Sequence, residues 1–278
     1  VVGIELLAES FPAGATSPTI VIANNDKVND VKHAAEAVDG VASVTVGSAT
    51  DEFTKLEVVL DGESQSDEAY ASIKALRTAV HDVEGADAKV GGLDAQALDV
   101  KDAYAHDQLI VIPMILILVF IVLVLLLRAL VAPVLLLVTV VASFFASMGA
   151  GWWIFTNVLG FPALDLSVFL YSFLFLVALG VDYNIFLVTR AKEEAEKLGT
   201  RAGMIKALSS TGGVITSAGI LLAAVFAVLG VLPLVALAQI GVIVCIGVLL
   251  DTLLVRTVIV PALAFIAGEK FWWPRKAN

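Results

Sequence analysis

The sequence is poor in charged residues and has almost no cysteine or histidine. Only 16% of its 278 residues are charged, against roughly 25% in soluble domains, which argues against a purely soluble protein. A single cysteine, Cys245, excludes a disulfide framework and a thiolate metal cluster. The three histidines, His33, His81 and His106, are widely separated, with no cysteine or paired carboxylate at ligand spacing. We therefore expect no metal site and no cofactor.

Charge of one sign is concentrated in one part of the chain. Residues 1–107 hold 20 acidic and 7 basic residues, a net charge of −13, whereas residues 108–278 hold 7 acidic and 10 basic residues, a net charge of +3. Neither part offers a basic stripe for phosphates, so nucleic acid is excluded as a main partner. A glycine-rich phosphate loop with lysine is also missing, which disfavours ATP-driven chemistry. The start at Val1, without a signal peptide, predicts that the chain is part of a longer polypeptide.

Long uncharged runs fill the second part of the sequence. They cover residues 108–127, 129–164, 166–181 and 207–250, and about 20 apolar residues suffice to cross the hydrocarbon core of a bilayer. Turn residues near 128–133, 157–162 and 230–233 divide the runs. The sequence therefore predicts a transmembrane bundle over 108–268 with five spans, at about 108–128, 133–156, 165–189, 209–229 and 235–256.

Basic residues predict the orientation of these spans. The ten basic residues of 108–278 are Arg128, five residues of the 190–206 loop, Arg256 and three residues of the C-terminal tail. The loops 157–164 and 230–234 contain no basic residue. Because lysine and arginine near span ends are retained in the cytoplasm, residues 1–107 are expected outside the plasma membrane and the C-terminus inside. Residues 269–278 form an expected cytoplasmic tail, whose aromatic residues 271–273 are either an interfacial anchor among membrane lipids or packed on the protein.

The acidic N-terminal part alternates strand-like and helix-like segments. Strands are predicted at 19–23, 41–46, 53–60 and 88–91, and amphipathic helices at 27–38 and 66–82. This order, βαβ-βαβ, predicts a ferredoxin-like α+β module. The fold class is therefore a polytopic α-helical membrane protein with an N-terminal α+β extracytoplasmic domain over 1–107.

Asp182 is the most informative single residue. It lies inside the third predicted span, where an ionised carboxylate costs about 2.5–3.5 kcal/mol and usually faces a bundle interior to handle ions or protons. Tyr183 supplies a neighbouring hydroxyl, and Gly180 permits close approach of another helix. The alternative is a structural aspartate neutralised by hydrogen bonds or by a cation.

Other polar residues in the spans have weaker claims. Asp251, near the cytoplasmic end of the fifth span, is expected to form a structural ion pair with Arg256. Thr216 and Ser217, in a run of small residues, are candidates either for helix packing or for hydrogen bonding to Asp182. Two intramembrane acids also raise the possibility of an aspartyl protease, but the different expected depths of Asp182 and Asp251 argue against it. We find no other catalytic constellation and expect a protein that is not an enzyme.

Several motifs follow one another in a specific order along the chain. They are Phe11-Pro-Ala-Gly14, the stretch 177–187 around Asp182-Tyr183, the small-residue stretch 211–219, the stretch 247–256 from Gly247 to Arg256, Pro261-Ala-Leu263 and Trp272-Trp-Pro274. In this order they resemble the C-terminal half of MmpL-type transporters of the RND superfamily.

This resemblance implies a transporter of two related halves, each with a porter subdomain, that exports lipids or other hydrophobic compounds and is driven by proton influx. It places Asp182 and Tyr183 in the intramembrane proton relay, with the equivalent pair in an N-terminal half absent from these 278 residues. The chain is then either a fragment of a full transporter or a half that needs a partner. The alternative hypothesis is a lipid-binding receptor or scaffold on the same architecture that does not pump.

Overall fold

A computed structural model describes residues 17–274 of the chain. Its contacts divide into two units, Val1–Ala105 and His106–Asn278, which are treated separately below. The motif Phe11–Gly14 and the tail residues Arg275 and Lys276 lie outside the described residues.

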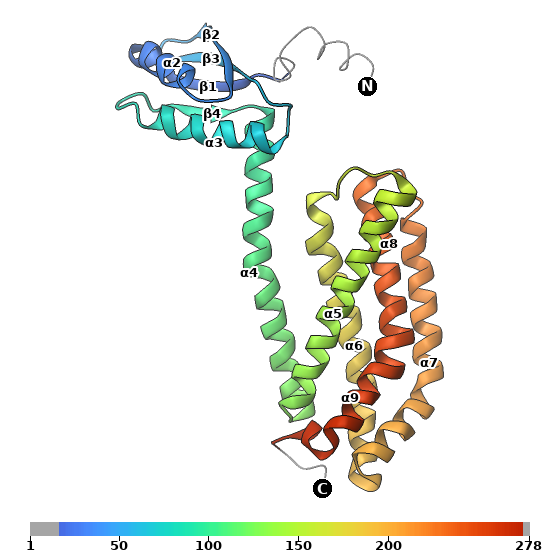
Figure 1. Cartoon of the computed structure of the whole chain (residues 1–278). Coiled ribbons are helices and arrows are strands. Elements are labelled where there is room, and N and C mark those ends of the chain that lie inside the picture. The colour runs from blue at the N-terminus through green and yellow to red at the C-terminus, as the bar shows by residue number, and fades with distance from the viewer. Residues whose placement is uncertain (1–16, 275–278) are drawn as a thin grey trace. The chain divides into compact units, whose positions relative to one another are not determined.

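The first unit is built on a four-stranded antiparallel sheet with strand order β2-β3-β1-β4 (Figure 1). A short 3₁₀ turn, Asn25–Lys27 (η2), leads into the first helix. The elements are Thr19–Asn24 (β1), Val28–Glu36 (α2), Val41–Ala49 (β2), Phe53–Leu60 (β3), Asp67–His81 (α3) and Lys89–Gly91 (β4). Their order confirms the predicted βαβ-βαβ module.

One face of this sheet is buried because apolar residues alternate along its strands. Val21 of β1 and Leu56 and Val58 of β3 point to the same face and are fully buried. They pack in one core with the apolar stripes of α2 and α3, which include Val31 and Ile73. At the start of α3, the Ser66 hydroxyl accepts a hydrogen bond from a backbone amide in the first turn, an N-cap that fixes where the helix begins.

Helix α4 (Leu93–Leu127) begins in the first unit and continues into the second. Its first turns are joined to α3 by the bidentate pair of Arg77 with Asp99 (2.5 and 2.8 Å) and by the pair of Lys101 with Asp67 (2.7 Å). The apolar run begins only near residue 108, so hydropathy located the span but not these polar turns, which α3 stabilises.

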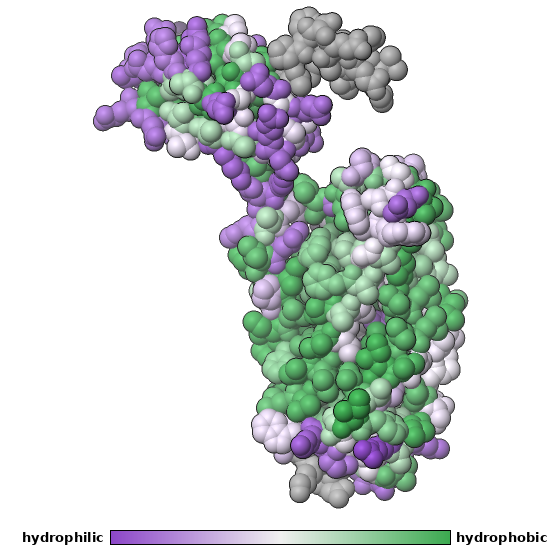
Figure 2. All heavy atoms as spheres, in the orientation of Figure 1, coloured by the Kyte–Doolittle hydropathy of each residue, from purple (hydrophilic) through white to green (hydrophobic). Residues whose placement is uncertain are grey.

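The second unit consists of helices only (Figure 1). After α4 come Val131–Ile154 (α5) with the π-turn Phe155–Leu159 (η3), Leu166–Leu198 (α6), Thr200–Leu229 (α7), Val235–Leu250 (α8), the π-helix Asp251–Ile259 (η4), Val260–Ala267 (α9) and Gly268–Trp272 (η5). Among the described residues, five helical segments are long and apolar enough to cross a membrane, which confirms the predicted number of spans. Hydrophobic residues cover the side of this unit, and polar residues gather at its ends (Figure 2).

Small residues bring these helices close together. A Cβ added at Gly151 of α5 would lie 2.6 Å from Ile243 of α8, and one at Gly203 of α7 would lie 2.6 Å from the backbone of Ala195 in α6. Without a side chain at these positions the backbones approach closely, which is how membrane helices gain packing energy.

The C-terminal aromatic residues mostly pack on the protein. Phe271 and Trp272 are 1% and 3% exposed, and the Trp272 indole donates a hydrogen bond to the Thr200 hydroxyl (3.1 Å). Only Trp273 is largely exposed, and its carbonyl accepts a hydrogen bond from the Leu130 amide (2.7 Å). Residues 271–273 were expected either to anchor the tail at the membrane interface or to pack on the protein. Phe271 and Trp272 pack on the protein.

Candidate intramembrane site

Helix α6 points three consecutive polar side chains in three directions. Successive residues of an α-helix are about 100° apart, so Asp182 is exposed on the surface of the helical unit, Tyr183 is half-buried and Asn184 is buried. The expectation that Asp182 faces the bundle interior is therefore not met within this chain. A run that is apolar on all sides does not reveal which face its neighbours will cover.

The Asp182 side chain has no hydrogen bond or ion pair with any of the described residues. The predicted hydrogen bonds from Thr216 and Ser217 are not formed: Thr216 is half-buried, and the Ser217 hydroxyl donates to the carbonyl of Val214 in its own helix (2.9 Å). An unpartnered carboxylate at this depth is costly in hydrocarbon. Asp182 is thus positioned to interact with a group outside this part of the protein.

The neighbouring residue, Tyr183, contacts a buried arginine. The Arg256 guanidinium lies over the Tyr183 ring, 4.7 Å from its centroid. Arg256 is 1% exposed, and none of its three side-chain nitrogens has a hydrogen-bond partner among residues 17–274. A desolvated cation–π contact of this kind contributes about 2 kcal/mol.

The ion pair expected between Asp251 and Arg256 is not formed at contact distance. Asp251 is 5% exposed, and its Oδ1 has no hydrogen-bond partner within the described part of the chain. Both residues belong to the π-helix η4, but their side chains contact different groups. Arg256 is directed to Tyr183 and Asp251 toward α5 and α6.

Gly180 makes room for the Asp251 carboxylate. A Cβ at Gly180 would lie 2.6 Å from Asp251 Oδ2 and 3.5 Å from Val140 of α5. The predicted close approach at Gly180 therefore exists, and the group that approaches is an acid from η4. On α5, the Ser143 hydroxyl lies beside the same carboxyl and donates to the carbonyl of Val140 (3.0 Å).

A second close contact joins α7 to η4. A Cβ at Gly219 would overlap Thr252, meeting its Cγ2 at 2.6 Å and its Cβ at 2.9 Å. The small-residue run that includes Thr216 and Ser217 therefore packs through Gly219, in agreement with the helix-packing interpretation.

The resulting site is a polar cluster inside an apolar bundle. It consists of Tyr183, Asp251, Thr252 and Arg256, which line one narrow gap, and of the buried Asn184, which follows Tyr183 on α6. Asn184 and Thr252 are 2% and 1% exposed, and neither side chain has a hydrogen-bond partner among the residues the structure describes. The gap between α6 and the α8–η4 segment beside these groups is too narrow to hold a water molecule. Several polar atoms of the cluster therefore keep unused hydrogen-bonding capacity within the described part of the chain. The described residues contain no group of ligands suited to a metal ion.

Sequence reasoning missed several of these residues. Thr252 and Ser143 carry no local signal, because an isolated hydroxyl in an apolar run is common in membrane helices. Gln239 was also missed: it is fully buried, accepts from the Asp165 amide and donates to the Ala163 carbonyl, both at 2.9 Å, and so holds the loop before α6. A polar amide in an otherwise uncharged span was the one signal that could have singled it out.

Five helices able to span a bilayer, an α+β domain and titratable residues within the spans define a multi-pass membrane protein. The MMPL family model matches residues 4–278, so the chain belongs to the MMPL family.

Three relatives are informative. A putative membrane protein of Streptomyces coelicolor is 49% identical over 97% of this chain, and the apo-petrobactin exporter of Bacillus anthracis is 36% identical over 99% of it. The sulfolipid-1 exporter MmpL8 of Mycobacterium tuberculosis is 41% identical over 74% of this chain and 19% of its own length. The first two matches cover 40% and 39% of those proteins, so the chain spans about two fifths of the length of these relatives.

Proposed function

We propose that this chain is the C-terminal half of an exporter of lipids or other hydrophobic compounds that is driven by the proton-motive force. Asp182 carries this proposal: it is an exposed acid within a membrane span, without a partner in the described part of the chain. An acid in that position needs a counterpart from outside, and the shortness of the chain relative to its relatives supports a further half that supplies it.

Asp182 and Tyr183 would form this half of the proton relay. Protonation removes the charge of Asp182 and with it the cost of keeping a carboxylate between helices. One proton crossing 100 mV supplies about 2.3 kcal/mol, enough to shift a conformational equilibrium more than tenfold. Tyr183 would couple the change to the fifth span, because its ring is the contact surface of Arg256.

The proposed orientation places the α+β domain outside the cell and the C-terminus in the cytoplasm. Contacts within the helical unit support it. The Lys192 ammonium donates to the carbonyl of Leu127 (2.7 Å), and the Leu130 amide donates to the Trp273 carbonyl (2.7 Å). The end of α4, the end of α6 and the tail therefore lie together, and most basic residues of residues 108–278 belong to these segments, as the retention of lysine and arginine in the cytoplasm requires.

The cargo class is proposed from chemistry. Relatives named as exporters of a sulfolipid and of apo-petrobactin differ in the molecule they carry. What a membrane-embedded half can offer to both is an apolar surface with few polar groups, which favours amphipathic cargo.

The experiment that tests the relay uses the whole polypeptide in proteoliposomes that contain a pH-sensitive dye. An imposed pH gradient should drive proton uptake and outward movement of a fluorescent hydrophobic probe such as Nile red. Asp182→Asn should abolish both, because the amide keeps the size of the acid and cannot exchange a proton. Asp107→Asn, an exposed acid of α4, is the matched control and should retain both. Full gradient-driven transport by Asp182→Asn would contradict the proposal.

Orientation is tested separately by thiol labelling of intact cells. In a Cys245→Ala background, a cysteine at exposed Glu84 of the α+β domain should react with an impermeant reagent. A cysteine at exposed Lys197, at the end of α6, should react only after the membrane is permeabilised. The reverse pattern would overturn the assignment.

A further inference from the structure

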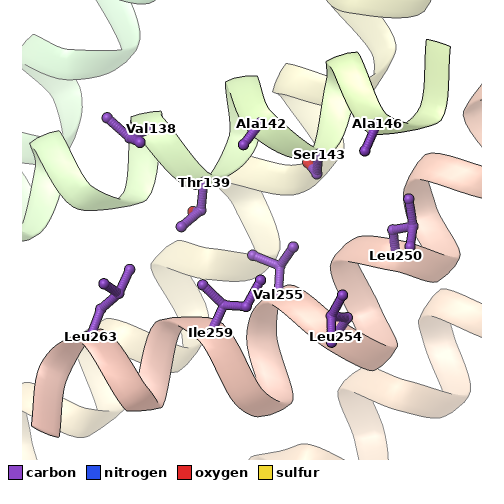
Figure 3. Close-up of a pocket in the computed structure, with 10 residues that line it drawn as sticks. All are labelled: Val138, Thr139, Ala142, Ser143, Ala146, Leu250, Leu254, Val255, Ile259 and Leu263. Carbon is purple, nitrogen blue, oxygen red and sulfur yellow. The ribbon is translucent and has the colours of Figure 1, made fainter. Parts of the chain in front are cut away.

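An apolar groove runs along the outside of the second unit between α5 and the α8–η4–α9 segment (Figure 3). Its volume is about 380 Å³. Ala142 and Ala146 of α5 lie on one wall, one turn apart, and Leu254 and Ile259 lie on the other. Because the alanines are short, the space between the two walls is left open. We refer to this feature as the α5 groove.

The α5 groove offers nothing to a polar ligand. Among its lining residues, only Thr139 and Ser143 carry polar side-chain atoms, and both hydroxyls donate to carbonyls of their own helix, at 2.8 and 3.0 Å. No charged and no aromatic residue lines it. An occupant must therefore be aliphatic, because a polar group placed there would lose its hydrogen bonds to water without replacement.

The dimensions of the groove match a single lipid tail. Val138 to Ala146 on α5 covers about 12 Å. Leu250 to Leu263 on the opposite wall covers less than the roughly 20 Å of an α-helix of that length, because most of it is π-helix. One leaflet contributes about half of a 30 Å hydrocarbon core, or about 15 Å. Val138 and Leu254 are 60% and 46% exposed, so the groove is open to the medium around the helices, which is hydrocarbon for a multi-pass membrane protein.

A helix fits the α5 groove less well than a flexible chain. The two walls are in direct contact farther along, where a Cβ at Gly151 would lie 2.6 Å from Ile243, and in Figure 3 they lie farther apart at Val138 and Leu263 than at Ala146 and Leu250. A helix with its side chains is about 10–12 Å wide, too wide for the narrow part of such a wedge, whereas an acyl chain can follow it. We propose that the α5 groove binds one acyl chain of a bilayer phospholipid.

This site would place a membrane lipid next to the polar cluster. Ser143 forms part of the groove wall, and its hydroxyl also lies beside the Asp251 carboxyl. A bound tail would keep α5 at its present distance from η4 and would exclude water from that side of Asp251. The proposal does not depend on the direction or the cargo of transport.

The test uses the polypeptide as the cell makes it, reconstituted in phosphatidylcholine vesicles that contain a small fraction of phosphatidylcholine with a diazirine at the end of one acyl chain. After irradiation, adducts are mapped by mass spectrometry. Adducts in 138–146 and 250–263 should exceed, per residue, those on the exposed α7 residues Leu221 and Val225. The double variant Ala142→Phe/Ala146→Phe fills the groove and should lower its labelling severalfold without changing that of α7.

The matched control is Ala224→Phe, the same substitution at an exposed alanine of α7, which should leave labelling of the α5 groove unchanged. If the double variant does not insert into the membrane, the smaller change Ala142→Leu is measured instead and should reduce labelling in the same region. Labelling no higher than on α7, or undiminished in a folded filled variant, would overturn the proposal. So would absence of label throughout the groove, since another segment of the polypeptide would then cover it.

Discussion

The contact between Gly219 and Thr252 predicts a large effect for the smallest possible substitution. In Gly219→Ala the new methyl group would overlap Thr252 Oγ1 and would lie 2.6 Å from its Cγ2 and 2.9 Å from its Cβ. The Cβ position is fixed by the backbone, so no rotamer of threonine relieves the overlap, and α7 must move away from η4. Overpacking of this kind costs about 1–3 kcal/mol, and the gain in helix propensity from glycine to alanine returns about 1 kcal/mol.

Gly213 provides a matched control in the same helix. It is exposed, and an added Cβ there has no atom within 4 Å, so Gly213→Ala gains the propensity without the clash. The two variants should therefore differ by about 1–3 kcal/mol in the free energy of unfolding, which is about fivefold to more than a hundredfold in the equilibrium constant.

Cys245 makes the measurement direct, because it is the single cysteine in the chain and is partly buried in α8. Its reaction with a fluorogenic thiol reagent, followed against increasing sodium dodecyl sulfate in a mild detergent, reports the opening of this helix. Gly219→Ala should open at lower denaturant than the parent and Gly213→Ala should not. Thr252→Ala, which removes two of the three overlapping atoms, should partly restore Gly219→Ala in a double-mutant cycle. Equal stability of the two glycine variants would refute the reasoning.

Three further outcomes follow from contacts described above. Tyr183→Leu should destabilise the helical unit by about 2 kcal/mol, by loss of the ring under Arg256, whereas Tyr183→Phe should not; equal Cys245 exposure curves would contradict this. Glu269→Ala removes the carboxylate that accepts hydrogen bonds at the start of α7 and should cost about 0.5–2 kcal/mol in the same assay; an unchanged curve argues against the cap. The Lys101 hydrogen bond lowers the pKa of Asp67 below its usual 3.8, so its stabilisation is complete above that pH and is lost as the pH falls through the lowered pKa. Asp67→Asn should flatten the acid side of the stability curve of the α+β domain, and an unaltered curve would show that the contact does not contribute.

Sequence periodicity located most elements because each has one dominant environment. The strand at 53–60 was predicted with the limits that the structure has, since its alternating residues face a core on one side only. The start of α4 at Leu93 was not predicted, because its first turns are polar and are stabilised by contacts with α3 rather than by the membrane. Residues that depend on distant partners cannot be read from a local pattern.

The candidate site shows the same limit in its residues. Asp182 could be singled out because an acid in a long apolar run is rare, but its exposure depends on which helices pack around α6. The association of Arg256 with Tyr183 could not be predicted from spacing. If residues 251–256 are treated as an α-helix, the directions of their side chains come out wrong, because the segment is a π-helix. No residue pattern in this segment indicates a π-helix.

The π-helix Asp251–Ile259 also affects how insertions and deletions of residues are tolerated in the fifth span. A stretch with i→i+5 bonding holds more residues than an α-helix of the same rise, so the fifth span carries surplus chain at this one place. Deleting a single codon here would let the segment close into an α-helix without interrupting the span. The change would fall on Asp251 and Arg256 themselves, because an α-helix has fewer residues per turn than a π-helix and would turn their side chains away from their present contacts. Insertions and deletions in this region are therefore constrained less by the membrane than by the contacts that Asp251 and Arg256 make with α6.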